Sequence, residues 1–155
     1  MSFNIVLVHP QIPNNTGNIG RLCVATNCHL HLIEPLGFEL TDKYLKRAGL
    51  DYWQYVQLTI HKSYQNFQQT LTSDARLFFT SAKATKSVWQ VNFQKNDYLI
   101  FGREADGLPI NIVQKANQLI QIPLYSKQIR SLNLANAVSV IIYEGLRQLN
   151  LPQNG

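Results

Sequence analysis

Short runs of apolar residues alternate with segments of mixed polarity along the whole chain. The first run is Phe3 to Val8, and a second strand is expected at His29 to Ile33. Continuous apolar runs of this length are typical of strands that are buried on both faces. Further strands are expected at Val56 to Ile60, Arg76 to Ser81, Tyr98 to Phe101 and Leu119 to Ile122.

Segments with helical spacing separate these runs. The first is expected to begin at Asn15 or Thr16, either of which could cap a helix that ends near Asn27. Because strands separated by helices build mostly parallel sheets covered on both faces, the pattern predicts a single α/β domain over residues 1–155. The other expected helices are a short basic one at Thr41 to Ala48, a polar one at Ser63 to Leu71, a brief one at Pro109 to Ala116 and a long one from about Asn133 to Leu149.

The last expected helix is apolar around most of its circumference, and its apolar residues include Leu134, Val138, Ile142 and Leu146. A helix of this kind must be covered on several sides. It is either the central helix of one subunit, or it packs half on its own sheet and half on a second subunit. The second interpretation is favoured, because a domain of this length has few elements that could surround its final helix.

Composition narrows the class of protein. Hydrophobic residues make up 45% of the chain and charged residues 15%, which indicates a globular fold. The net charge of +5 indicates an anionic partner such as nucleic acid, or serves solubility alone. Cys23 and Cys28 do not share a helix face and are expected to be small buried side chains in a reducing compartment. With no leader and no apolar stretch of membrane length, we expect a cytoplasmic protein.

Several common catalytic motifs are absent from the chain. No G-x-G-x-x-G follows the first strand, and neither a P-loop nor a G-x-S-x-G nucleophile elbow occurs. His29 and His31 could share one face of a strand, which is the only hint of a metal site. Because no third ligand is near in the sequence, a structural role is favoured for this pair, and we expect no metal.

Three polar loops remain, and each follows an expected strand. They are Asn15 to Arg21, Phe101 to Pro109 and Arg130 to Ala137. Because the carboxyl ends of parallel strands meet at one edge of a sheet, these loops and Thr80 to Lys83 are expected to converge on one crevice. Helix amino ends at such an edge present free N–H donors, which suit phosphate or carboxylate oxygens.

Individual residues in these loops have more than one interpretation. Glu104 could meet a ligand amine or a sugar hydroxyl, or it could be a solvated acid in a turn. Arg21 could contact a phosphate, or it could form a salt bridge or lie on a solvated face. Ser131 and Asn133 are first expected to cap the last helix, which is compatible with ligand contact.

The three blocks together resemble the SPOUT class of RNA 2′-O-methyltransferases. The blocks are N-x-x-N-x-x-R from Asn15, G-x-E-x-x-G-L-P from Gly102 and I-P…S-L-N-x-x-N-A from Ile122. The segments 33–38 and 47–52 are similar to those of the small bacterial tRNA (cytidine/uridine-34-2′-O)-methyltransferases. The resemblance covers nearly the whole chain.

This resemblance implies a fold, a cofactor and partners. The fold is an α/β sheet with a C-terminal trefoil knot, in which two subunits pair through their first and last helices. The cofactor is S-adenosyl-L-methionine and the substrate is tRNA. The implied cofactor contacts are Thr80, Gly102, Ile122, Leu124, Ser131 and Ala137. The implied RNA contacts are Arg21, Lys43, Lys46, Arg47 and Arg130.

The resemblance also implies the reaction, an in-line attack of a ribose 2′-oxygen on a sulfonium methyl group. The implied catalytic residues are Asn15, Arg21, Glu104, Ser131 and Asn133. Because a guanidinium is hard to deprotonate, Arg21 is assigned to electrostatic stabilisation and phosphate binding rather than to the general base. The alternatives are methylation of another RNA position or of ribosomal RNA, and a non-catalytic RNA-binding module on the same scaffold.

Overall fold

The computed structural model describes residues 1–41 and 51–153. Its centre is a seven-stranded sheet in the order β3-β2-β1-β6-β4-β7-β5, and every pair of neighbouring strands is parallel. The strands are β1 (Asn4–Val8), β2 (His29–Ile33), β3 (Gln57–His61), β4 (Leu77–Thr80), β5 (Lys86–Ser87), β6 (Tyr98–Phe101) and β7 (Leu119–Gln121). The predicted α/β class is therefore confirmed.

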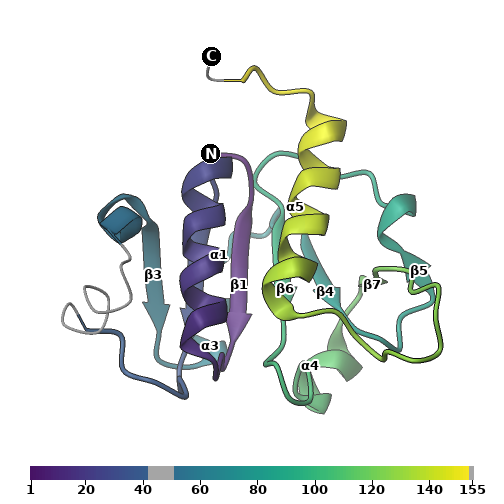
Figure 1. The fold of residues 1–155 in the computed structure, drawn as a ribbon, viewed down its shortest axis with the longest axis horizontal. Coiled ribbons are helices and arrows are strands. Elements are labelled where there is room, and N and C mark those ends of the chain that lie inside the picture. The colour runs from purple at the N-terminus through teal and green to yellow at the C-terminus, as the bar shows by residue number, and fades with distance from the viewer. Residues whose placement is uncertain (42–50, 154–155) are drawn as a thin grey trace.

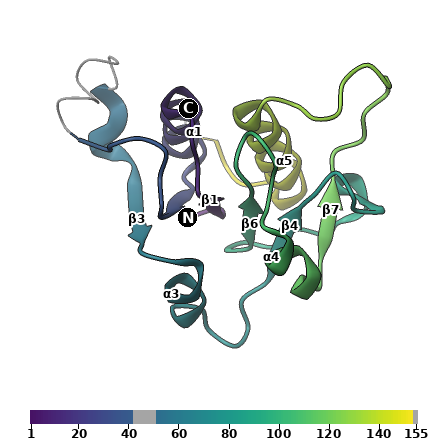
Figure 2. The same ribbon diagram turned by 90° about the horizontal axis from the view of Figure 1, so that it is seen from below.

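Helices cover both faces of this sheet (Figure 1). Seen from below, α1 and α5 lie on one side of the sheet and α3 and α4 on the other (Figure 2). The helices are α1 (Pro13–Thr26), α3 (Tyr64–Gln69), α4 (Ile110–Lys115) and α5 (Leu134–Leu149), with 3-10 turns η1 (Asp51–Tyr55) and η2 (Val88–Gln90). None of the described helices is both long enough and apolar enough to cross a membrane.

The strands are apolar on both faces because each face has its own core. On the side of α1 and α5, Leu7 and Leu99 pack with Ile19 of α1 and Ile141 of α5. On the opposite side, a smaller cluster gathers around Phe67 of α3 and Ile112 of α4. All five residues of β1 are buried, which explains why the first strand is a continuous apolar run.

The start of α1 differs from the prediction. The helix begins at Pro13, with Ile12 at the N-cap and no side-chain cap, so Asn15 and Thr16 lie inside the first turn. Proline is well suited to the first helical position, because the N–H that it lacks would have no partner inside the helix. The expectation of an asparagine or threonine cap was therefore wrong. The free N–H groups before the helix are bound in another way, described below.

Two other differences concern short elements. The strand β5 and both 3-10 turns were not predicted, because elements of two to five residues are too short to show a repeating hydrophobic pattern. The expected basic helix at Thr41 to Ala48 lies outside the described residues beyond Thr41. The trefoil knot stays a prediction.

The last helix packs on its own sheet through a fully buried face. Val138, Ile141 and Ile142 have no exposed surface, and Gly145 is also buried. Figure 1 shows α5 beside α1 on the same face of the sheet. Tyr143 points away from this core and is 55% exposed. The apolar residues of α5, which are spread around most of the helix, are thus largely covered by the sheet and by α1 of the same subunit.

Candidate active site

The site forms where the parallel strands end. The strands β1, β6 and β4 lie in register, since Leu7 pairs with Phe101 and Phe79 with Ile100. Their carboxyl ends therefore share one edge of the sheet, as predicted. The polar segments that follow β1, β6 and β7 lead into α1, α4 and α5 respectively.

Glu104 binds the amino end of α1. One carboxylate oxygen accepts a hydrogen bond from the backbone N–H of Gln11 at 3.0 Å, and the other accepts from the N–H of Ile12 at 2.6 Å. The second oxygen also accepts from the side-chain amide of Asn15 at 3.3 Å. A carboxylate from a distant loop thus binds the two backbone N–H groups that precede the helix, and its negative charge is favourable beside a helix amino end.

Asn133 extends this network to the last helix. Its amide nitrogen donates to Oδ1 of Asn15 at 3.1 Å. Its own oxygen accepts from the backbone N–H groups of Ala135 at 2.9 Å and Asn136 at 3.3 Å. Asn133 is therefore the N-cap of α5, as predicted, and a contact to α1 at the same time, whereas Ser131, which was also expected to cap, lies two residues before the cap. The chain of hydrogen bonds from Glu104 through Asn15 to Asn133 is called the carboxamide network below.

The loop that carries Glu104 is folded tightly on itself. Arg103 and Gly107 exchange backbone hydrogen bonds at 3.3 and 2.9 Å, and Gly107 has a φ of +75°. Arg103 also pairs with the carboxylate of Asp106 through its Nε and Nη2, which lowers the pKa of that carboxyl group. A Cβ on Gly102 would collide with the backbone of Gly107 and Leu108. Glycine at 102 is therefore required for the loop to close over the end of β6.

Arg21 lies on the exposed side of α1 and is separate from this network. Its guanidinium carbon is 5.7 Å from the centre of the Tyr52 ring, and the Tyr52 hydroxyl donates to the carbonyl of Gly17 at 2.9 Å. Within residues 1–41 and 51–153, no ion pair forms at Arg21. The salt-bridge interpretation of Arg21 therefore has no support in the described part of the chain, and the guanidinium stays available to an anion.

The implied cofactor residues lie around the same edge. Thr80, at the end of β4, is half-buried and donates to the carbonyl of Ile100 at 3.1 Å. Gly102 is buried, Ile122 and Ala137 are half-buried, and Leu124 and Ser131 are exposed. Small and apolar side chains beside hydroxyl and amide groups suit a nucleoside that carries a charged sulfur and an amino acid. The residues present therefore fit S-adenosyl-L-methionine.

The predicted RNA contacts divide into two groups. Arg130 is exposed in the segment that leads from β7 to α5. Lys43, Lys46 and Arg47 lie outside the described residues.

The sequence did not reveal the backbone of Gln11 and Ile12 as partners of Glu104, because a backbone amide has no signature in the sequence.

His29 and His31 do share a strand face, and a third histidine joins them. The rings of His29 and His31 are stacked at 4.2 Å, and Nδ1 of His31 lies 3.0 Å from Nε2 of His61 on β3. The other ring nitrogen of His31 lies 3.0 Å from Oδ1 of Asn4. Burial, and next the neighbouring His29 and His61, lower the pKa of His31 to about 3. In the described ranges, no group of three or more His, Cys, Asp or Glu residues is placed to hold a metal ion.

Comparison with known proteins agrees with this geometry. The SpoU rRNA methylase family matches residues 2–143. A tRNA (cytidine(34)-2′-O)-methyltransferase from Yersinia pestis is 50% identical, over 96% of this chain and 95% of its own. A structure described as giving insight into 2′-OH methylation of C/U34 on tRNA is 44% identical, with a TM-score of 0.90 and 96% of each chain covered.

A more distant structure shares the fold alone. The SpoU methyltransferase AviRb from Streptomyces viridochromogenes, in complex with the cofactor AdoMet, is 20% identical, with a TM-score of 0.79. The alignment covers 97% of this chain and 58% of that protein. A family match over most of the chain, a relative at half identity and an edge of the sheet built from the three predicted blocks agree with one another. The chain belongs to the SpoU methylase family.

Proposed function

We propose that this protein transfers a methyl group from S-adenosyl-L-methionine to the ribose 2′-hydroxyl of the wobble nucleotide of tRNA, a cytidine or uridine at position 34. The observation that carries the proposal is the carboxamide network, in which Glu104, Asn15 and Asn133 meet at one edge of the sheet. The Yersinia pestis relative, which matches nearly the whole chain at 50% identity, supports the choice of substrate.

The cofactor would be held by Thr80, Gly102, Ile122, Leu124, Ser131 and Ala137. When bound, it supplies the methyl group. The half-buried Ile122 and Ala137 offer apolar surface to an adenosine, and the exposed hydroxyl of Ser131 offers a polar contact. Closure of the loop 103–107 over Gly102 keeps Glu104 at the start of α1 while the cofactor is held.

Asn15 and Asn133 would orient the ribose. Each is already held in place, because the two bind each other, Asn15 also binds Glu104, and Asn133 also binds the backbone of α5. Little further ordering is therefore needed when the substrate binds. Glu104 acts in this scheme by holding Asn15 and the start of α1. Ser131 lies two residues before the N-cap of α5 and faces solvent, where a substrate can reach it.

Arg21 would stabilise the charge that develops on the 2′-oxygen and bind the neighbouring phosphate. A guanidinium is hard to deprotonate, so Arg21 is a poor proton acceptor near neutral pH and a good electrostatic partner. The Tyr52 ring below it restricts its position without neutralising its charge. Because no acid of the described residues pairs with Arg21, its N–H donors are free to bind an anionic substrate.

The net charge of +5 favours an RNA partner, for which Arg130, Lys43, Lys46 and Arg47 are the proposed contacts.

We also propose a cytoplasmic homodimer that pairs through α1 and α5. The exposed apolar side chains Val24 and Tyr143 lie on these two helices and support this choice. Tyr143→Glu tests the pairing by sedimentation, with Lys95→Glu as a surface control. A charge at the fully buried Val138 or Ile142 would test folding instead.

The deciding experiment is mass spectrometry of nucleosides from tRNA of cells with and without the gene, followed by reaction of purified protein with S-adenosyl-L-methionine. We expect a 2′-O-methyl pyrimidine at position 34 to disappear on deletion and to return in the reaction. If that nucleoside is unchanged while ribosomal RNA loses a 2′-O-methyl group, the substrate is ribosomal RNA. If no nucleoside changes and the protein still binds RNA, it is a non-catalytic module.

Arg21→Ala tests the residue assigned to charge stabilisation. We expect methyl transfer to fall by 10²-fold or more, the usual size for loss of one such group, while affinity for S-adenosyl-L-methionine is retained. Arg21→Lys, which keeps the charge but not the planar fork, should recover part of the rate. Equal loss of transfer and of cofactor affinity would show that Arg21 belongs to cofactor binding.

A further inference from the structure

The segment between β7 and α5 carries unusually exposed apolar side chains. It reaches away from the sheet before returning to α5 (Figure 2). Tyr125 is 92% exposed and Ile129 is 60% exposed, and Leu124 and Leu132 on either side of them are also exposed. Single exposed apolar side chains are common on proteins, but four of them within residues 124–132 form an apolar surface, which is typical of a binding site.

The charge of this part of the chain has one sign. Between Asp106 and Glu144 the sequence contains no aspartate or glutamate. Lys127 and Arg130 lie in the exposed segment beside Tyr125, and neither forms an ion pair with the described residues. A surface that combines an aromatic ring, unpaired cations and no acids is complementary to a polyanion whose units have flat apolar faces. Single-stranded RNA has that chemistry.

The location connects this surface to the candidate site. The segment ends at Asn133, which caps α5 and donates to Asn15. A nucleotide whose ribose lies at the carboxamide network therefore has its neighbours in the RNA loop close to the end of this segment. Tyrosine suits stacking here because its side chain has only two rotatable bonds, so fixing it costs little conformational entropy.

We propose that Tyr125 is a stacking platform for an unpaired base of the substrate RNA loop, with Lys127 and Arg130 contacting the phosphates on either side. This inference rests on the proposed function for the identity of the RNA. Tyr125 determines how the loop is held, and it takes no part in methyl transfer itself. Its contribution is therefore to RNA affinity and to the choice of a flexible, single-stranded target.

The experiment measures binding of the purified full-length protein to an anticodon stem-loop RNA with 2-aminopurine in the loop. Loss of one base–aromatic stack weakens binding by roughly 5- to 150-fold. Tyr125→Ala should therefore raise the Kd about tenfold and abolish quenching of the probe, whereas Tyr125→Phe and Tyr125→Trp should stay within about twofold of the parent. Gln128→Ala, an exposed polar neighbour in the same segment, is the matched control and should change neither.

Salt dependence separates the ring from the cations. Lys127→Ala should reduce the slope of log Kd against log salt by about one, and Tyr125→Ala should leave that slope unchanged. Affinity for S-adenosyl-L-methionine should be the same in all of these variants. Unchanged RNA affinity in Tyr125→Ala overturns the proposal, and so does an equal loss of cofactor affinity or a shift in subunit association.

Failure of the proposed function gives a different result. If the parent protein methylates no tRNA, the proposed substrate is wrong. The same binding series with an unstructured oligouridylate then still decides whether Tyr125 stacks on single-stranded RNA. Binding that is insensitive to residue 125 in both RNAs overturns the inference regardless of the enzyme's substrate.

Discussion

The side-chain amide of Asn133 donates to the side-chain oxygen of Asn15 at 3.1 Å, across 118 positions of the chain. This contact joins the first turn of α1 to the N-cap of α5. Each residue also has a second partner, Glu104 for Asn15 and the α5 backbone for Asn133. The two helices that lie side by side in Figure 1 are thus linked at the same edge that carries the candidate active site.

The first prediction concerns this contact. In a double-mutant cycle, Asn15→Ala and Asn133→Ser should show a coupling free energy of about 0.5–1.5 kcal/mol in the free energy of unfolding. Serine at 133 still caps a helix, so the cycle isolates the contact to Asn15. The measurement is urea denaturation, with Asn15→Ala and Asn111→Ala as an uncoupled control pair. Coupling as small as in that control would mean that the hydrogen bond contributes nothing to stability.

The second prediction concerns the loop that carries Glu104. A methyl group at Gly102 collides with the backbone of Gly107 and Leu108, so Gly102→Ala must displace the loop. We expect it to lower the free energy of unfolding by about 2–3 kcal/mol. Gly107→Ala introduces strain at a φ of +75° but meets no neighbour, and should cost about 1 kcal/mol. Both values come from urea denaturation, and the reverse order would contradict the steric explanation.

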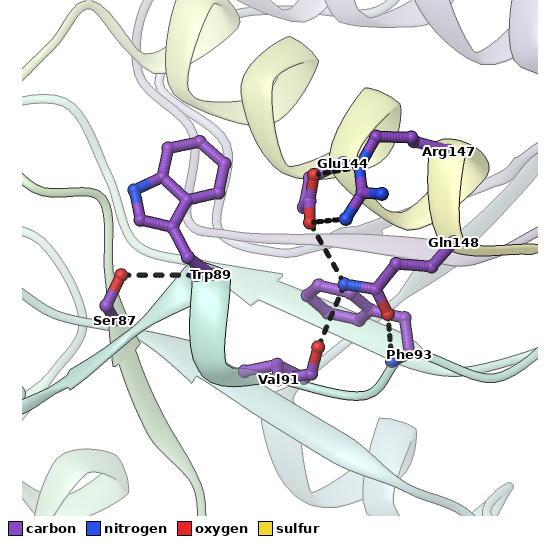
Figure 3. Close-up of polar contacts among 7 residues, drawn as sticks. All are labelled: Ser87, Trp89, Val91, Phe93, Glu144, Arg147 and Gln148. Atoms are coloured by element: carbon purple, nitrogen blue, oxygen red, sulfur yellow. Dashed lines mark hydrogen bonds and ion pairs between the residues drawn. The ribbon is translucent and has the colours of Figure 1, made fainter.

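The third prediction concerns the end of α5. The Gln148 amide accepts from the N–H of Phe93 at 2.8 Å and donates to the carbonyl of Val91 at 2.9 Å and to Glu144 at 3.1 Å (Figure 3). Gln148→Met keeps the volume but leaves these backbone groups unpaired, so it should lower the free energy of unfolding by about 1–3 kcal/mol.

Arg147→Ala is the contrast to that variant. Arg147 pairs with Glu144 on the surface at 2.8 Å (Figure 3), and an exposed pair of this kind contributes at most about 1 kcal/mol. Thermal or urea unfolding of the two variants in parallel checks the ranking. If Arg147→Ala lowers the free energy of unfolding more than Gln148→Met does, the hydrogen bonds from Gln148 to the backbone at 91–93 are not what stabilises this end of α5.

The fourth prediction concerns pH. His31 is held neutral in the folded protein, with a pKa of about 3, while an unfolded histidine binds a proton near pH 6.5. The unfolded state therefore binds more protons than the folded state between these values, and the stabilisation is complete above about pH 6.5 and lost as the pH falls toward 3. The neighbouring His29 and His61 also have lowered pKa values, chiefly through burial, and act in the same direction.

Urea denaturation between pH 7 and 4 checks this prediction. Each such histidine steepens the fall in the free energy of unfolding by up to about 1.4 kcal/mol per pH unit. His31→Gln should remove the contribution of this one histidine to the slope. An unchanged slope in His31→Gln would show that this ring does not stay neutral in the folded protein.

Much of this structure could be predicted from the sequence, and what could not has a physical reason. The first strand was found because β1 is almost entirely apolar and is buried along its whole length. The cap at Asn133 was found because amide side chains bind free helix N–H groups. The contact between His61 and His31 was not predicted. In the register of β2 and β3, His61 pairs with Ile33, so only the folded structure shows that the two histidine rings meet.

The candidate site was predicted as a set of residues and not as a geometry. The blocks around Asn15, Glu104 and Asn133 were expected to converge, and they do. That Glu104 binds the backbone of Gln11 and Ile12 could not be read from side chains. That Arg21 lies over Tyr52 depends on where η1 packs, which no local pattern records.

The carboxamide network has a consequence for how the protein is made. Its parts come from the residues that leave the ribosome first, from the loop at 104 and from the residues near 133, so no nascent fragment that ends before Asn133 can contain it. A translation product interrupted earlier would lack the contact between α1 and α5 that this network supplies. The link between the first and last helices, on which the proposed active site depends, therefore forms only after residue 133 has been made.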